Sequence, residues 1–474
     1  MPEKLITFGA FDYAVIIAYF VFVLGIGFHR KNSASGQKED FLLAGRSLTL
    51  PMFVSTLVAT WYGNILGVGE FVYRDGLVGW VCFSFTYYVA ALLFALFISR
   101  KVRSLGATSI PEQIEQRFGR VAGIISSIIV LFITLPAVYV LLLGVVVQLF
   151  TGWSLPISIT VSALLTFTYI YKGGFKANVA TNSFQFVLMY VGFALLLVFS
   201  IINFGSPLDL ASHLPASHTT LTGTYGLQYV LVWFIIAFQT FVDPGFHQRC
   251  ASARTPNIAR SGVLISILFW MLFDFMTLTT ALYAKAYLPE IAGGGLMSYP
   301  ALSQAVLPAV CKGIFMVTII ATVMSTLSSY AFLSGATLGN DIIGKLMPKS
   351  KISSVRLMQI GLLISGISCI ILAIAIPSAV DLIYKTASIA VPGLFFPLLT
   401  TYSKRLDLSH RNAIIIMLAS SLSSLVWTIC GMLGVHCNFI INDLFIAVEP
   451  MLPGIIISVL LGVLLIKKKD LANV

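Results

Sequence analysis

Long apolar runs separated by short polar connections fill most of the chain. A helix rises about 1.5 Å per residue, so roughly 20 apolar residues cross the hydrocarbon core of a bilayer. Runs of this kind predict thirteen transmembrane helices, at 11–29, 47–72, 77–99, 121–150, 154–171, 178–203, 225–245, 261–284, 308–340, 355–376, 382–402, 412–433 and 444–466. Because this number is odd, we expect the two termini on opposite sides of the membrane.

Composition supports the same class of protein. Hydrophobic residues make up 58% of the chain, charged residues only 10%, and the mean hydropathy is +0.96. Soluble proteins carry about a quarter charged residues, and an outer-membrane barrel shows alternating segments of roughly ten residues instead of helix-length runs. The sequence therefore predicts an all-α integral membrane protein in contact with the lipid bilayer.

The basic residues predict the orientation. The net charge is +11, but Lys and Arg lie between the apolar runs rather than on one polar face, which argues against a nucleic-acid partner. Positive charge marks the cytoplasmic side of a membrane protein. We therefore expect a multi-pass protein of the cell (inner) membrane, with its N-terminus outside and its C-terminus in the cytoplasm. Of the 29 Lys and Arg, 24 lie within connections that alternating helices place on one side: 30–46, 100–120, 172–176, 249–260, 345–356, 404–411 and 467–469.

One predicted helix repeats hydroxyl side chains along a single face. Thr322, Ser325, Thr326 and Ser329 recur at spacings of three and four residues, so they lie on the same side of the helix. No bulk water satisfies them inside a bilayer, and a cluster of neutral oxygens suits a hard cation such as Na⁺. The alternative is that each hydroxyl bonds to a carbonyl one turn earlier, or to a neighbouring helix.

The helix predicted at 47–72 is interrupted by glycine. Gly63, Gly67 and Gly69 lie at membrane depth, with Glu70 directly after them. Glycine permits unwinding, and an unwound turn exposes carbonyl oxygens that can ligate an ion. Packing against another helix through small residues is the alternative. A carboxylate in the membrane is costly and usually faces a cavity, so Glu70 is a candidate polar residue.

Two further predicted helices carry acidic residues at depth. The helix at 225–245 contains Gln239 and Asp243 just before Pro244, and the helix at 261–284 contains Asp274. Proline cannot continue the helical hydrogen bonds, so a kink is expected there. Asp274 is either a structural hydrogen-bond acceptor or part of a polar pathway.

Five segments in order resemble one family of carriers. The chain is similar to the solute:sodium symporter family, which includes bacterial proline, pantothenate, sialic acid and sugar carriers. The resemblance covers the core from the second predicted helix to the ninth. The segments are DFLLAGRSL (40–48), ATWYG followed by GVGEFVY (59–73), GGFKANVATNSFQ (173–185), DPGFHQRCASARTPNIAR (243–260) and ATVMSTLSSYAFLSGATLGNDI (321–342).

The resemblance implies a LeuT-like fold of two inverted five-helix repeats. We then expect an extra N-terminal helix with a basic cytoplasmic loop in 1–46, and the first repeat in 47–203. The second repeat would occupy 204–402, and 403–474 would hold two C-terminal helices and a basic cytoplasmic tail. The solute and ion sites would lie at the midplane between the repeats.

The resemblance also implies a sodium site that joins two helices. By position, Ser325 and Thr326 would supply hydroxyl oxygens and Thr322 a backbone carbonyl, while Ala59 and Tyr62 would supply carbonyls from the interrupted helix. The residues named from the hydroxyl spacing and the glycines lie in the same two helices.

The expected function is sodium-coupled symport of a small polar organic solute, neutral or zwitterionic, by alternating access. Many relatives have an acid at the position of Asn182, and in some of them it contributes to a second sodium site or to ion exit, so we expect one sodium ion per solute. We expect the solute to contact four residues of the interrupted and kinked helices, with help from three aromatic rings. The four are Trp61, Asn64, Gln239 and Asp243, and the rings are Trp233, Tyr87 and Phe396.

Three rival functions remain at this stage. Protons could replace sodium through Glu70, Asp243 or Asp274, or the chain could be a membrane sensor that binds solute without moving it. An enzyme is disfavoured, because no nucleophile–base pair or metal-ligand spacing lies on a plausible common face.

Overall fold

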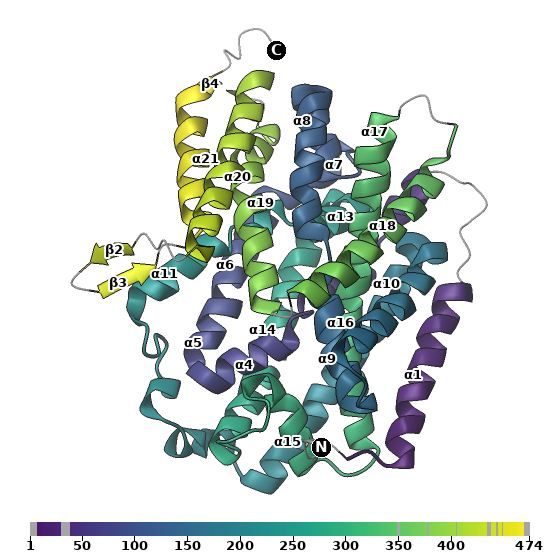
Figure 1. Cartoon of the computed structure of the whole chain (residues 1–474), viewed down its shortest axis with the longest axis vertical. Helices are drawn as coiled ribbons and strands as arrows, with labels where there is room; N and C mark the ends of the chain where they lie inside the picture. Colours follow the sequence, from purple (N-terminus) through teal and green to yellow (C-terminus); the bar gives the residue numbers. More distant parts are fainter. Residues whose placement is uncertain are drawn as a thin grey trace.

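The computed structural model describes residues 7–29, 38–347, 351–376, 379–403, 405–433, 438–441, 444–447 and 449–468, and these form a bundle of packed helices (Figure 1). Within this part of the chain, seven helical stretches are long and apolar enough to cross a membrane. Two more candidate spans are bent pairs, and four shorter apolar helices coincide with other predicted spans. The basic residues Arg30, Lys31, Lys349, Lys404 and Lys469 lie outside the described residues.

The N-terminal half runs from a peripheral helix into the first broken span. Its elements are α1 (Ala10–His29), α2 (Lys38–Leu43), η1 (Ala44–Arg46), α3 (Leu50–Trp61), α4 (Ile65–Asp75), α5 (Leu77–Trp80), η2 (Val81–Phe85), α6 (Thr86–Phe97), α7 (Ser99–Leu105), α8 (Ile110–Thr134), α9 (Ala137–Thr151) and α10 (Leu155–Phe204).

The C-terminal half contains the second broken span and two short pairs of antiparallel strands, β1 with β4 and β2 with β3. Its elements are η3 (Pro207–His213), η4 (Ala216–Thr219), α11 (Gly226–Ile236), α12 (Gln239–Val242), α13 (Pro244–Ser252), α14 (Pro256–Tyr287), η5 (Gly295–Met297), α15 (Ser298–Val306), α16 (Cys311–Ala336), η6 (Thr337–Ile343), α17 (Gly344–Leu346), α18 (Ser354–Ala375), α19 (Ala379–Thr401), β1 (Leu406–Asp407), α20 (His410–Met432), β2 (Asn438–Ile441), β3 (Leu444–Ala447), α21 (Met451–Leu465) and β4 (Lys467–Lys468).

Three boundaries differ from the predicted spans. Helix α8 is broken at Gly119, with φ 81° and ψ 172°, next to the predicted start of the span at 121–150. That span is then interrupted at Leu135 and Pro136 before α9, because proline lacks the N–H that a continuous helix needs. Element α10 covers two predicted spans and is broken between them at Gly174, where φ is 60° and ψ is −162°. The span predicted at 444–466 begins with strand β3, and its helix α21 starts at Met451.

Helix α16 lies at the centre of the bundle (Figure 1). Its most apolar window is 89% buried inside the protein, whereas that of the peripheral α20 is 33% buried. Helices α1, α3, α9, α10 and α18 pack around α16. The hydroxyl-bearing helix is therefore shielded from lipid, so its polar side chains meet other parts of the protein.

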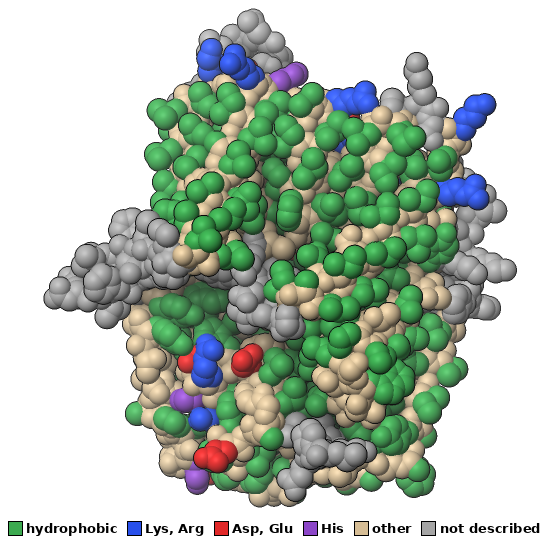
Figure 2. All heavy atoms as spheres, viewed as in Figure 1, with side chains coloured by type: hydrophobic (Ala, Val, Ile, Leu, Met, Phe, Trp, Pro, Cys, Tyr) green, Lys and Arg blue, Asp and Glu red, His purple; other side chains and the backbone are tan. Residues whose placement is uncertain are grey.

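The surface fits a bilayer. Hydrophobic side chains cover the middle of the visible face, and Lys and Arg side chains lie along its upper edge (Figure 2). Strand β4 and the first turns of α8 lie at that upper end, whereas the first described residues lie at the opposite end, near α15 (Figure 1). Thr7 donates its backbone N–H to the Gln304 side chain of α15 at 3.1 Å.

Candidate functional site

The predicted interruption is present at the centre of the protein. Helix α3 ends at Trp61, α4 begins at Ile65, and the chain bends by 57° between them. A Cβ atom on Gly63 would lie 2.5 Å from Thr326 Cβ and 2.6 Å from the Tyr139 ring. Only a residue without a side chain therefore allows the turn to lie directly against α16.

Three of the predicted sodium-binding oxygens meet beside this turn. The Ser325 hydroxyl lies 2.6 Å from the carbonyl oxygen of Ala59 and 2.7 Å from that of Thr322. All three residues are fully buried. Hydroxyl and carbonyl oxygens are the ligand types that a hard cation prefers. The arrangement joins the end of α3 to the middle of α16.

The other two predicted ligands are placed differently. The Thr326 hydroxyl donates to the carbonyl of Thr60 at 2.8 Å, so Thr60 supplies an oxygen that sequence reasoning did not name. The Tyr62 carbonyl accepts the N–H of Ile65 at 3.0 Å inside the turn. Its side chain points elsewhere, because the Tyr62 hydroxyl donates to Asp274 at 2.9 Å.

A buried arginine lies next to these oxygens, contrary to its predicted position in a cytoplasmic connection. Helix α13 continues past Pro244 and carries Arg249 into the bundle, where it is fully buried. One guanidinium nitrogen donates to the hydroxyls of Thr60 at 2.8 Å and Ser329 at 2.9 Å. Asn182 donates to the same two hydroxyls, at 3.2 and 3.0 Å.

A cavity of about 120 Å³ opens on the other side of the α3–α4 turn. It is lined by all four residues that were expected to contact a solute, together with Asp274 and aromatic rings. The lining consists of Thr60, Trp61, Tyr62, Asn64, Val68, Phe83, Ser84, Tyr87, Tyr139, Gln239, Asp243, Asp274 and Tyr330. Residues from six separate spans therefore meet at one place.

The expected aromatic residues divide into two groups. Tyr87 lines this central cavity, with its ring 5.2 Å from that of Trp61. Trp233 packs instead against Phe83, with ring centroids 4.7 Å apart, and Phe396 packs where Gly462 of α21 passes. Neither they nor Glu70 are among the lining residues. The sequence analysis did not name Tyr139 and Tyr330, because the position of an aromatic residue in an apolar helix does not show which side of the helix faces a cavity.

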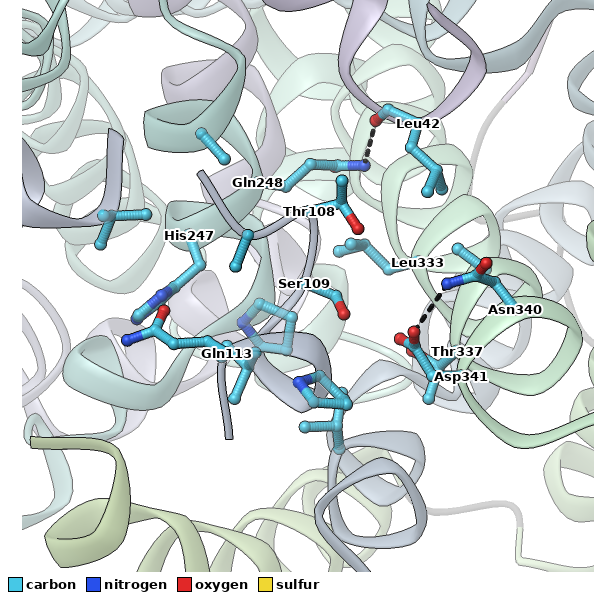
Figure 3. Close-up of a pocket in the computed structure, with 18 residues that line it drawn as sticks. Leu42, Thr108, Ser109, Gln113, His247, Gln248, Leu333, Thr337, Asn340 and Asp341 are labelled. Carbon is cyan, nitrogen blue, oxygen red and sulfur yellow. Dashed lines mark hydrogen bonds between the residues drawn. The ribbon is translucent and has the colours of Figure 1, made fainter. Parts of the chain in front are cut away.

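A second, smaller cavity of about 30 Å³ lies beyond α13 (Figure 3). His247 and Gln248 line it, whereas Asp243 lines the central cavity, so α13 separates the two. Gln248 donates to the Leu42 carbonyl at 3.2 Å, and the Asn340 amide donates to Asp341 at 2.7 Å (Figure 3). This inner cavity is lined by apolar residues as well as these polar side chains, and it adjoins the connections that carry the basic residues.

Comparison with known proteins identifies the family. The sequence model of the sodium:solute symporter family matches residues 41–409. The chain belongs to this family. Membership confirms the resemblance inferred from the five segments and agrees with the expectation of a transporter rather than an enzyme.

Relatives in this family carry different solutes. The chain is 25% identical over 415 residues to a sodium/glucose cotransporter 4 of Danio rerio, covering 76% of this chain and 62% of that protein. It is 22% identical to the sodium/pantothenate symporter of Escherichia coli, covering 94% of each chain. The structure of a Na⁺-coupled sialic acid symporter superimposes with a TM-score of 0.79 at 15% identity, covering 98% of this chain and 100% of that one. That similarity confirms the predicted all-helical, LeuT-like fold.

Proposed function

We propose that this protein is a sodium-coupled symporter that imports a small polar organic solute across the cell membrane by alternating access. The observation that carries the proposal is the contact of the Ser325 hydroxyl with the carbonyls of Ala59 and Thr322. It places three oxygens suited to Na⁺ where the broken span meets α16. Relatives named as sodium/pantothenate and sodium/glucose carriers support the same reading.

Sodium would act by holding α3 and α16 together. In this proposal Ser325 and Thr326 supply hydroxyls, and Ala59, Tyr62 and Thr322 supply carbonyls. A ligand shifts a conformational equilibrium only through its different affinity for the two states. An ion that bridges two helices has that property, because its ligands separate when the helices move apart. One positive charge crossing a potential of 100 mV contributes about 2.3 kcal/mol to transport.

The solute would occupy the central cavity, on the other side of the same turn. Trp61 and Asn64 belong to the turn itself, and Gln239 and Asp243 come from the second broken span. Solute and sodium thus share the residues of one turn, which supplies the coupling between them. Release toward the cytoplasm would require α13 to move, because this helix separates the central cavity from the inner one.

The repeats and the orientation complete the proposal. The two broken spans, bent by 57° and 42°, lie five spans apart, as expected for inverted repeats in 47–203 and 204–402. The basic connections would face the cytoplasm, which places the N-terminus outside.

A single sodium ion per solute fits the contact of Arg249 and Asn182 with Ser329, because a fixed positive charge there disfavours a second cation.

Uptake into proteoliposomes tests the proposal. A panel of labelled amino acids, vitamins, sugars and monocarboxylates is offered with an inward sodium gradient, and separately with a proton gradient alone. We expect sodium-driven uptake of at least one solute, which the double change Ser325→Ala and Thr326→Ala abolishes. Ser334→Ala is the matched control, because among the described residues the hydroxyl of this buried serine on the same helix bonds only back to Ala331, at 3.0 Å.

Two results would contradict sodium coupling. Uptake that runs on protons alone and is indifferent to the double change would move the coupling to Glu70, Asp243 or Asp274. Saturable binding of a solute with no net uptake under either gradient would favour a sensor.

A further inference from the structure

The central cavity is rich in hydrogen-bond acceptors and carries negative charge. Asp243 and Asp274 both line it, with the amide side chains of Asn64 and Gln239 beside them. No Lys or Arg is among its lining residues in the described part of the chain. A buried carboxylate is costly unless a cation or several hydrogen bonds compensate it. The hydrogen-bond donors and counter-ions of each carboxylate therefore determine whether its negative charge is compensated.

Asp274 is held by two tyrosines. It is 3% exposed on α14, and it accepts hydrogen bonds from the hydroxyls of Tyr62, at 2.9 Å, and Tyr88. Neither partner carries a positive charge, and no ion pair to Asp274 forms among the described residues. The hydrogen bonds fix the position of the carboxylate and leave its charge without a counter-ion.

Asp243 is held in a similar way. It is 4% exposed and caps helix α13 by accepting the N–H of Phe246 at 2.9 Å, and it also accepts the Tyr330 hydroxyl at 2.5 Å. Arg249 follows on the same helix and offsets part of this charge. Its hydrogen bonds, however, go to hydroxyls on α3 and α16 and to two groups of its own helix, Gly245 and Gln248. Two carboxylates therefore face one cavity with a single arginine nearby.

The remaining walls suit a cation that carries N–H groups. The Asn64 side-chain oxygen is buried and accepts no hydrogen bond from the described residues, so it can accept one from a ligand. Half-buried Trp61 lies with its ring 5.2 Å from the rings of Tyr87 and Trp270. Cations bind the faces of such rings. Acceptors, negative charge and aromatic faces thus surround the same space.

We propose that the transported solute is an organic cation with a protonated amine. Its ammonium group donates to Asp243, Asp274 and Asn64, and its apolar part lies against Trp61 and Tyr87. The inference rests on the proposed function, since it takes the central cavity as the solute site of a symporter. It replaces the neutral or zwitterionic solute expected from the sequence. A neutral solute leaves Asp274 without a counter-ion and the charge of Asp243 only partly offset by Arg249, and a zwitterion brings a carboxylate for which the lining offers no cation.

Sodium-driven uptake of a charge-matched panel tests the proposal. The probes are labelled ethanolamine, putrescine and tyramine as amines, with choline, proline, glucose and pyruvate as quaternary, zwitterionic, neutral and anionic solutes. We expect saturable uptake of at least one amine, and stabilisation of the purified protein against heating by the same amine. Losing one charge-assisted hydrogen bond lowers affinity by roughly tenfold or more.

Two conservative variants locate the binding group. Asp243→Asn keeps a side chain that caps α13, and Asp274→Asn keeps an acceptor for Tyr62. Each should raise the KM for the amine about tenfold or more. Asp209→Asn, an exposed residue of η3, should leave it unchanged. Should one variant fail to fold, the other still tests the site, because each carboxylate contacts the ammonium independently.

The outcomes separate this proposal from the function on which it rests. Sodium-driven uptake of proline, glucose or pyruvate without any amine overturns the cationic solute and leaves symport standing. Amine uptake that is unchanged by both Asp→Asn variants also overturns it. Amine uptake driven by protons alone keeps the cationic solute and overturns sodium coupling. If no amine is taken up and none stabilises the protein, the proposal of a cationic solute is wrong, whether or not sodium drives the uptake of another solute.

Discussion

At the scale of single residues, Ser329 joins the candidate ion site to the rest of the bundle. Its hydroxyl accepts from Arg249 at 2.9 Å and from Asn182 at 3.0 Å, and lies 2.9 Å from the Ser325 carbonyl, to which it donates. One hydroxyl thus connects a fixed positive charge on α13 with a residue of the proposed sodium site. Two buried donors use it as an acceptor, in addition to the hydroxyl of Thr60.

Ser329→Ala should therefore destabilise the protein. Arg249 and Asn182 each lose an acceptor in a dry environment, which costs about 1–3 kcal/mol. We expect a lower thermal denaturation temperature for the purified protein in detergent. The matched control is Ser334→Ala on the same helix, where no donor depends on the hydroxyl and its one bond returns to Ala331. An equal decrease in denaturation temperature for both variants would contradict the role of Ser329 as an acceptor for these buried donors.

The sequence analysis named the residues of the proposed ion site that share a helix, and it did not name the neighbours that packing brings to them. The spacing of Thr322, Ser325 and Ser329 is a local property of α16, so periodicity alone places them together. Arg249 was assigned to a connection because it follows Pro244 and lies near other basic residues. Its burial depends on the contact of α13 with α3 and α16, which no local pattern reports.

At the scale of elements, the broken α3–α4 span is the feature on which both sites depend. Its turn brings Ala59 toward α16 and Trp61 and Asn64 toward the central cavity. Gly63 permits this arrangement, since any side chain there would meet Thr326. Glycine spacing predicted the break correctly, because unwinding is a local property of the backbone.

Gly63→Ala should push the turn away from α16. The new methyl group would lie 2.5 Å from Thr326 Cβ, and overpacking of this kind costs about 1–3 kcal/mol. If that cost falls on the sodium-bound state, the sodium concentration for half-maximal uptake rises about fivefold to 150-fold. Gly431→Ala on α20 is the control, because nothing lies within 4 Å of its added methyl group. Unchanged sodium dependence for Gly63→Ala would contradict the proposed contact.

Helix ends were predicted less well than helix interiors, for physical reasons. The apolar run at 121–150 begins beside Gly119, where α8 is broken, but it does not include the polar helical turns at 110–118, which extend beyond the apolar layer. In α10, two predicted spans join at Gly174 with hardly a connection between them. Hydropathy indicates which residues lie in lipid. It does not show that a helix continues into water, or that the chain turns sharply within a few residues.

At the scale of the whole molecule, the asymmetric distribution of positive charge is the main sign of orientation. Positive residues resist translocation, so the side that carries them stays in the cytoplasm. Lys and Arg gather at the end of the molecule that holds β4 (Figure 2). The connection between α13 and α14 contains the exposed Arg254, and the connection between α10 and α11 contains Leu208, which is 89% exposed. An odd number of crossings separates them.

Single cysteines at these two positions decide the orientation. Leu208→Cys should react with a membrane-impermeant thiol reagent on intact cells, whereas Arg254→Cys should react only after the membrane is opened. The unmodified protein is the control, and its own labelling is subtracted. Its cysteines Cys82, Cys250 and Cys369 are buried and should react slowly from either side, whereas Cys311 and Cys430 are partly exposed. The reverse pattern would place the basic connections outside. Sodium entering down its gradient would then meet the inner cavity first, and the proposed direction of transport would have to be inverted.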